Sequence, residues 1–355
     1  MSYLFAILLF SFLIFIHELG HFAAAKAFGV QVNEFSLFMG PALFQKQIGQ
    51  TVYSVRCIPI GGFCAMEGED GEEPSDNPHA FPNAAWWKKA VILAAGAFMN
   101  FVVGVLLMLA FFAPDKQFIM PVVSEVDPRC SFAGEAGIQA GDRLWSIDGE
   151  RIYVSSDFSM LLSLKGGETH DLVVLRGGKR VSLPNLDLRK QDFENEDGTV
   201  TQRYGFSFTL CNASPGVTLG YSWNSTLDCV RLVRLSLQML LRGQAGVQDV
   251  SGPVGIVQQM ATVADNSGSA YYAFLNMIYF GSFIAINLSV MNLLPIPALD
   301  GGRVVGVLLS AAYEGITKKK PNPKIEGYIH GAGMVLLMAL MVLLLFKDII
   351  FAIKG

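Results

Sequence analysis

Long uninterrupted runs of apolar residues dominate the hydrophobic pattern of this chain. Four runs are long enough to cross a bilayer as helices, which takes about 20 residues each. They cover residues 2–28, 86–113, 271–294 and 328–351. The second run opens with Trp86, Trp87, Lys88 and Lys89, which are typical of a membrane interface. The pattern predicts a polytopic α-helical membrane protein with about four transmembrane helices.

The segment between the second and third runs has a different pattern, with short alternating stretches separated by turn residues. Strands are predicted at residues 122–126, 143–147 and 172–176, with Gly-containing turns at 148–149 and 177–178. A short helix is expected to begin near Ser156, with a Ser or Asp cap. We therefore predict a small inserted α+β domain over residues 117–188.

The residues from 189 to 270 combine polar and amphipathic stretches. A polar insert at 191–198 is expected to form a hairpin or a loop. Residues 221–241 mix apolar positions with arginines, which predicts a helix lying along the membrane surface. A Gly-Pro turn at 252–255 then leads to the third run. Four regions result: 1–113, 117–188, 189–270 and 271–355.

Composition and charge support a membrane protein and exclude some partners. Charged residues make up 16% of the chain, against roughly a quarter in soluble domains. The net charge of −4 argues against a nucleic acid as partner. The five cysteines form no CxxC pair; Cys130 and Cys211 could form a disulfide, but separate thiols are favoured. The first apolar run has no basic leader or cleavage site, so we expect it to be retained rather than removed as a signal peptide.

Lysines in the short loops predict the orientation. Lys318, Lys319, Lys320 and Lys324 separate the last two runs, and Lys88 and Lys89 flank the second. Cytoplasmic loops carry such an excess, so both termini and the inserted domain are predicted to be extracytoplasmic, with membrane lipid around the spans. The acidic stretch at 67–73 is expected to be a solvated cytoplasmic loop.

The first apolar run contains the sequence His17-Glu18-Leu19-Gly20-His21. Residues four apart share a helix face, so His17 and His21 can bind one metal ion. Glu18 can reach the attacking water as general base, which is the arrangement of zinc hydrolases. Ionisable groups at membrane depth are costly and rare, which favours a functional role over three satisfied core residues.

A catalytic zinc site needs a third protein ligand, and Asp300 is the candidate. Pro295 and Pro297 break the third apolar run just before it, and Gly301 and Gly302 follow it. Irregular backbone at this depth is tolerated only against protein or a water-filled cavity. The alternative is a helix that simply ends at the prolines, with Asp300 capping the next helix over residues 301–313.

Together these motifs resemble the site-2 protease family, in particular the bacterial RseP-type intramembrane zinc metalloproteases. The resemblance rests on the histidine motif, Gly252-Pro253-Val254-Gly255, and the Asn-x-x-Pro-x-Pro-x-Leu-Asp-Gly motif at 292–301. It implies Zn²⁺ at His17, His21 and Asp300, with Glu18 as general base. It further implies cleavage of transmembrane segments of single-span membrane proteins in the bacterial inner membrane, such as anti-sigma factors already cut outside, as a step of regulated intramembrane proteolysis.

Other stretches extend the resemblance to substrate binding. Residues 136–149 resemble a PDZ domain, which implies a peptide or protein ligand added at a sheet edge. Residues 51–56 alternate like a strand and 59–63 follow as a turn; in the family this is a membrane re-entrant β-hairpin, where Gly61, Gly62 and Phe63 would pair with an unwound substrate. Asn292, with Pro295, resembles a substrate-contacting motif. Relatives often carry two PDZ domains, whereas this chain has room for one clear copy.

Two other classes of function stay open at the level of sequence. A membrane scaffold with a PDZ domain and a decayed active site would show no chelator-sensitive cleavage. A metal-ion transporter using the intramembrane His and Asp residues would show metal flux in vesicles, but it would leave Glu18 and the inserted domain without a role.

Overall fold

The computed structural model describes residues 2–69, 76–194, 199–244, 246, 252–319 and 323–354. The chain forms two compact units. One unit combines Met1–Phe111 with Cys229–Gly355, and the other is Phe112–Asp228. Each unit is built around its own core, and each is described by itself below.

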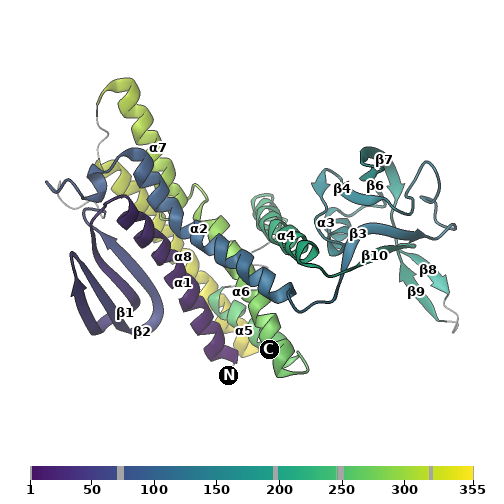
Figure 1. Cartoon of the computed structure of the whole chain (residues 1–355), viewed down its shortest axis with the longest axis horizontal. Helices are drawn as coiled ribbons and strands as arrows, with labels where there is room; N and C mark the ends of the chain where they lie inside the picture. Colours follow the sequence, from purple (N-terminus) through teal and green to yellow (C-terminus); the bar gives the residue numbers. More distant parts are fainter. Residues whose placement is uncertain are drawn as a thin grey trace. The chain divides into compact units, whose positions relative to one another are not determined.

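The four apolar runs form helices long enough to cross a membrane, as predicted. These helices are α1 (Ser2–Ala27), α2 (Trp86–Phe112), α6 (Ala270–Asn292) and α8 (Pro323–Lys354). Each contains at least 18 consecutive residues of spanning hydropathy. Two shorter helices, α5 (Pro253–Asp265) and α7 (Asp300–Thr317), complete the bundle (Figure 1). Residues 221–241 fall within a helix as predicted, α4 (Pro215–Leu241); its place at the membrane surface stays a prediction.

Small residues let the helices approach closely, as is common in membrane bundles. A Cβ atom on Gly20 of α1 would lie 2.7 Å from the carbonyl carbon of Ala95 on α2. On α2, Gly104 lies against Ile286 of α6, and its carbonyl accepts a 2.7 Å hydrogen bond from Ser282. Buried side chains of α1, α5 and α6 fill the space between these helices: Ala6, Leu13, Met260, Met277, Ile284 and Ala285.

A sheet of two long, bent strands follows α1: β1 (Val32–Ile48) and β2 (Thr51–Met66). Residues 34–37 have partners on both sides, 52–55 on one and 62–65 on the other. Residues 59–63, predicted as a turn after a strand, are part of β2. The chain nevertheless reverses between residues 55 and 62, because residues 52–55 run in the same direction as their partners 34–37, whereas residues 62–65 run in the opposite direction. Gly61 permits the reversal with a φ of 78°.

The sheet is attached along α1. Ser11 Oγ donates to the carbonyl of Pro59 at 2.8 Å, and Lys26 Nζ donates to Thr51 Oγ1 at 2.6 Å. Rings from both elements pack between these anchors: Phe15, Phe22, Phe35 and Tyr53. The strand that returns from Pro59 is therefore held beside the middle of α1 (Figure 1).

The second unit contains an antiparallel sheet, the helix α3 (Ser156–Lys165) and the first part of α4. Its strands follow the order β10-β3-β4-β6-β7, with β5 beside β4. They are β3 (Gln117–Val126), β4 (Arg143–Ile147), β5 (Glu150–Arg151), β6 (Thr169–Arg176), β7 (Lys179–Asp187) and β10 (Phe206–Asn212). The three predicted strands are confirmed. The sheet also recruits β10, which lies beyond the predicted end at residue 188, because β10 pairs with β3 across a long connection.

The connection between β7 and β10 contains the polar insert, for which a hairpin or a loop was expected. It forms a hairpin of β8 (Gln191–Glu194) and β9 (Val200–Arg203). Residues 195–198 lie outside the described residues. The predicted Ser or Asp cap of α3 is wrong. Ser155 is the N-cap, but its side chain makes no capping bond. Asp157 instead accepts hydrogen bonds from the Tyr153 and Val154 amides of the preceding loop. Cys130 and Cys211 are separate free thiols, as favoured.

Candidate metal centre

The two histidines of α1 point to a single place in the bundle. Both are buried, and their Nε2 atoms lie 3.2 Å apart. The rings meet edge to face, with centroids 4.7 Å apart and planes at 86°. The four-residue spacing on one continuous helix is what brings them together. Two nitrogen ligands are therefore preformed by secondary structure alone.

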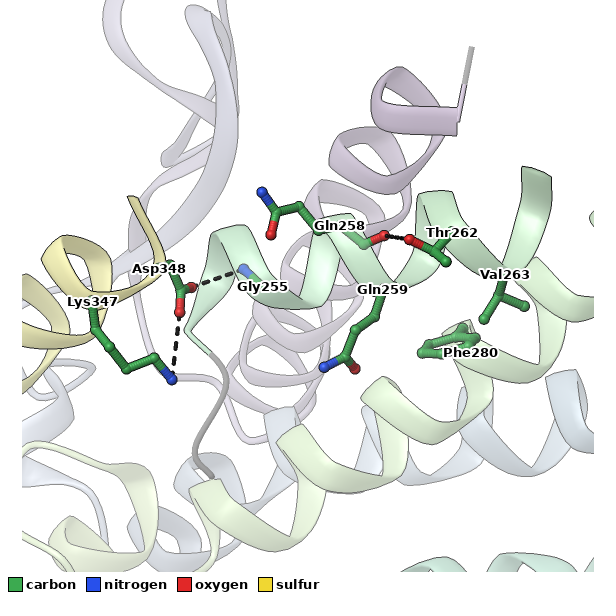
Figure 2. Close-up of a pocket in the computed structure, with 8 residues that line it drawn as sticks. All are labelled: Gly255, Gln258, Gln259, Thr262, Val263, Phe280, Lys347 and Asp348. Atoms are coloured by element: carbon green, nitrogen blue, oxygen red, sulfur yellow. Dashed lines mark hydrogen bonds and ion pairs between the residues drawn. The ribbon is translucent and has the colours of Figure 1, made fainter. Parts of the chain in front are cut away.

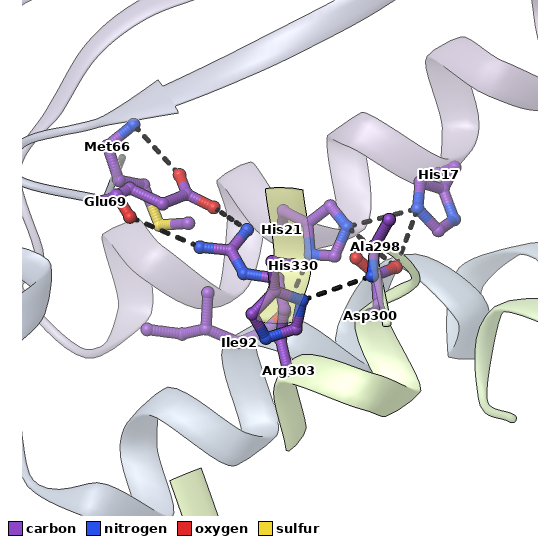
Figure 3. A network of polar contacts seen from close by, with 9 residues as sticks. All are labelled: His17, His21, Met66, Glu69, Ile92, Ala298, Asp300, Arg303 and His330. Carbon is purple, nitrogen blue, oxygen red and sulfur yellow. Dashed lines mark hydrogen bonds and ion pairs between the residues drawn. The ribbon is translucent and has the colours of Figure 1, made fainter. Parts of the chain in front are cut away.

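Asp300 supplies a third group from a distant part of the chain. α6 ends at Asn292, an irregular segment carries the two prolines, and Asp300 is the first residue of α7. Its Oδ2 lies 3.0 Å from His17 Nε2 and 3.4 Å from His21 Nε2 (Figure 3). The N-cap position of α7 is occupied by Leu299 and not by Asp300. The carboxylate of Asp300 instead lies against the two histidines.

The spacing of the three groups fits a tetrahedral zinc ion. Zinc lies about 2.0–2.1 Å from nitrogen or oxygen ligands, so the edge between two tetrahedral ligands is about 3.3 Å. The three edges here are 3.0, 3.2 and 3.4 Å. The three residues are also the group of His, Cys, Asp and Glu side chains, among those described, whose ligand atoms converge within 4.8 Å.

A backbone contact orients His21 for metal binding. Its Nδ1 lies 2.8 Å from the carbonyl oxygen of Ile92 on α2. A carbonyl only accepts, so Nδ1 carries the proton and the Nε2 lone pair faces Asp300 and His17. Metal-bound histidines commonly have such a partner on the second nitrogen. His17 Nδ1 is buried without a hydrogen-bond partner among the described residues.

Glycine on α2 makes room for the imidazoles. A Cβ on Gly96 would lie 2.7 Å from His21 Cε1 and 2.8 Å from His17 Cε1, so a larger residue would displace the ligands. The two glycines after Asp300 have a related role, since Gly301 and Gly302 lie against the backbone of residues 293–297. Sequence reasoning missed Gly96, because a glycine in an apolar helix gives no sign of what it packs against.

Glu18 lies next to the returning half of β2. A Cβ on Gly62 would be 3.9 Å from Glu18 Cγ, which places the strand beside the side chain that follows the first histidine. Nearby Cys64 is buried, and burial raises the pKa of its thiol above the ordinary value.

The other residues predicted to contact substrate differ in how exposed their side chains are. Gly61 and Gly62 are buried, whereas Phe63 is partly exposed under the guanidinium of Arg56, 5.0 Å from the ring centre. Asn292 is the last residue of α6 and is partly exposed, and Pro295 is exposed in the segment before Asp300. Their contact with a substrate stays a prediction.

Two further contacts hold the segment around Asp300, and the sequence indicated neither. Arg303 forms an ion pair with Glu69, and the amide of Ala298 donates to His330 Nδ1 of α8 at 3.1 Å. Glu69 belongs to the acidic stretch expected to be a solvated loop. That expectation is wrong for Glu69, whose side chain is 13% exposed, because the arginine draws it inward. Residues 70–73 lie outside the described residues.

A separate open pocket of about 500 Å³ lies between α5, α6 and α8 (Figure 2). Asp348 lines it and accepts hydrogen bonds from the amides of Gly255 at 2.8 Å and Gly252 at 3.4 Å. A side chain on Gly252 would collide with that carboxylate. The prediction of a turn at residues 252–255 is therefore wrong: Pro253 begins the helix α5, and the amides of Gly252 and Gly255 are bound by an aspartate of α8.

Two histidines and an aspartate whose ligand atoms converge among apolar helices of spanning length are the arrangement expected of a metallopeptidase in a membrane. Comparison with known proteins agrees. The model of peptidase family M50 matches residues 5–340, so the chain belongs to this family, the site-2 proteases. It is a multi-pass membrane protein and a metalloendopeptidase, and its cofactor is zinc.

Relatives cover almost the whole chain. A Clostridium perfringens protein named "putative zinc metalloprotease" is 37% identical over 358 residues, 99% of this chain and 100% of the relative. A Clostridium acetobutylicum protein of the same name is 35% identical over 353 residues, 98% and 97% of the two chains. The regulator of sigma-W protease RasP of Bacillus subtilis is 26% identical over 426 residues, 97% of each chain.

Proposed function

We propose that this protein hydrolyses peptide bonds within the transmembrane segments of single-span membrane proteins. The observation that carries the proposal is the convergence of His17, His21 and Asp300 within 4.8 Å, on elements embedded among apolar helices. A soluble protease has no need of ligands on a helix of spanning length. The substrate bond is therefore expected to reach the site from the membrane.

The ligands are assigned as His17 Nε2, His21 Nε2 and Asp300 Oδ2. Bound zinc would act as a Lewis acid toward the substrate carbonyl and its attacking water. Glu18 accepts the proton of that water and returns it to the leaving amine. Ile92 keeps His21 in the tautomer that ligation requires, and the surrounding helices exclude bulk water from the reacting bond.

The returning half of β2 is suited to hold a substrate in extended form. A helical segment shields its peptide bonds, so it must unwind before attack. Residues 62–65 pair with 34–37 on one side only, within the part of the chain that the structure describes. An extended substrate pairing with the other side would lie beside Glu18. Asn292 and Pro295 would contact the substrate from the end of α6.

The proposed location is the bacterial inner membrane, with both termini and the unit of residues 112–228 outside the cytoplasm. Lys88 supports the placement of one end, because its Nζ lies 3.5 Å from the Phe28 carbonyl and joins the basic ends of α1 and α2. Positive charge of this kind favours the cytoplasmic side. The name of RasP, a regulator of a sigma factor, fits substrates such as anti-sigma factors already cut outside.

The β-rich unit is proposed to be a PDZ-like domain that binds a peptide or protein and gates access to the site. Among the described strands, β10 and β7 lie at the two edges of its sheet, where strand addition could occur. It supplies none of the proposed metal ligands, all of which belong to the helical unit.

Glu18→Gln tests the proposal, because the amide keeps the shape of the side chain but cannot act as the base. The purified variant in detergent should retain one zinc per chain and lose cleavage of a single-span membrane reporter by at least about 100-fold, the scale of general-base catalysis. A chelator should stop wild-type cleavage, and added zinc should restore it. Substantial turnover by zinc-loaded Glu18→Gln would refute the assigned role.

A further inference from the structure

The guanidinium of Arg303 joins the helix that carries Asp300 to the loop that follows β2. Arg303 lies one helical turn beyond Asp300 on α7. It forms an ion pair with the Glu69 carboxylate, and its second nitrogen lies 3.5 Å from the Glu69 carbonyl (Figure 3). The side chains are 27% and 13% exposed, so the contact is shielded from water more than a surface pair is.

Glu69 is held firmly on its own side. Its amide donates to the Met66 carbonyl at 3.3 Å, and its Oε2 accepts from the Met66 amide at 3.4 Å. Gly68 between them has a φ of 73°, and a Cβ there would lie 3.0 Å from Pro82. The carboxylate is thus joined to the end of β2 through a tight turn.

The segment before Asp300 is irregular, and it is held by backbone hydrogen bonds of its own and by the Ala298 amide, which donates to His330 Nδ1 of α8 at 3.1 Å. Ala298 adopts a φ of 75°, which a non-glycine residue takes only where surrounding contacts hold it. Leu299 begins α7 without a side-chain cap. Contacts with other elements contribute to the rotation of α7 about its axis, and Arg303 makes such a contact, with Glu69, on the turn next to Asp300.

We propose that Glu69 is a positioning residue which, through Arg303, sets the rotation of α7 and thereby aims Asp300 at His17 and His21. The same end of β2 carries Gly62 beside Glu18, so one sheet would align both the third ligand and the strand next to the general base. The inference rests on the proposed function, since it takes Asp300 as a ligand.

A small rotation is enough to matter. The carboxylate of a helical residue lies about 5–6 Å from the helix axis, so a turn of about 10° moves it about 1 Å. Metal–ligand distances tolerate only about 0.2 Å. Loss of the ion pair would therefore disturb coordination without unfolding the bundle.

The test uses the full chain in detergent, with Glu69→Gln as the isosteric variant and the exchanged pair Glu69→Arg with Arg303→Glu as the rescue. The matched control is Glu34→Gln. Glu34 forms a comparable pair with Arg56, 2.7 Å apart and 22% and 21% exposed, but both residues lie within the sheet. The readouts are zinc affinity by chelator competition, the visible spectrum of the Co²⁺-substituted protein, and kcat and KM for a membrane reporter.

Glu69→Gln is expected to weaken zinc binding about tenfold, to change the Co²⁺ spectrum and to lower kcat more than KM. The exchanged pair should recover the spectrum, and Glu34→Gln should leave zinc affinity and spectrum unchanged. A wild-type spectrum and zinc affinity in Glu69→Gln would overturn the proposal, as would an exchanged pair no better than the single variant. If Asp300→Ala kept full zinc affinity, the ligand assignment itself would fail, which separates the two hypotheses.

Discussion

Replacing Gly96 by alanine tests whether the α1–α2 contact shapes the metal site. The added Cβ would lie 2.7 Å from His21 Cε1 and 2.8 Å from His17 Cε1, which is well inside van der Waals contact. The hydrogen bond from His21 Nδ1 to Ile92 leaves that ring little freedom to move aside. Either the helices separate or both ligands shift from their present spacing.

The magnitude follows from known effects of overpacking. Inserting one methyl group into a close-packed interior costs about 1–3 kcal/mol. If the strain is relieved by movement of the ligands, it appears as a loss in zinc affinity of about 10- to 100-fold. Alanine also favours helix over glycine by about 1 kcal/mol, so α2 itself would gain stability. Weaker zinc binding could not then be ascribed to a weaker helix.

The assay is chelator competition for zinc on purified protein, with thermal unfolding of the metal-free form measured alongside. Gly104→Ala is the matched control, because it makes the same change on the same helix. Its Cβ would lie 2.6 Å from Ile286 Cγ1 and would crowd α6 instead of the histidines. Only Gly96→Ala should lose zinc affinity beyond its effect on stability. Equal zinc affinity in Gly96→Ala and the wild type would refute the reasoning.

Two further predictions address the third ligand and the β-rich unit. Asp300→Ala should lose zinc as well as activity. Asp300→Asn should bind zinc more weakly than the wild type, because a neutral oxygen is a poorer ligand. Metal analysis of the purified variants checks both, and full zinc occupancy in Asp300→Ala would mean that the third ligand is another residue. Removal of residues 117–212 should leave zinc binding intact and preserve cleavage of a trimmed reporter while weakening selectivity against its longer form. The ends of that segment are already adjacent, since the Ala213 amide donates to the Lys116 carbonyl at 2.8 Å. The readout is the ratio of cleavage of the two reporters, and a zinc-loaded deletion inactive on the trimmed one would contradict the gating role.

The end of the β-rich unit is a feature that could not be predicted from the sequence. Alternation and turn residues predicted β3, β4 and β6, because local pattern and propensity act within each strand. Nothing local connects β10 to β3, more than 80 positions earlier in the chain. The pairing depends on a long-range register, so the predicted domain ended at residue 188 and omitted a strand of its own sheet.

The spanning helices and most of the candidate site could be predicted from local sequence patterns. A bilayer requires about 20 apolar residues per helix, and the four-residue spacing of His17 and His21 places them on one face; both constraints act over short segments. The breaks at Pro295 and Pro297 marked Asp300 for the same local reason. These features needed no knowledge of what packs against what.

The contacts that support the site could not be predicted in this way and depend on the packing of distant segments. Gly96, Ile92 and the Glu69–Arg303 pair act on the ligands through contacts between elements far apart in sequence. Glycine, isoleucine and a charged pair are common at positions with no such role, so residue type carries no signal of it. Packing between helices fixes the distance between α1 and α2. It also fixes the rotation of α7, which sets the position of the Asp300 carboxylate.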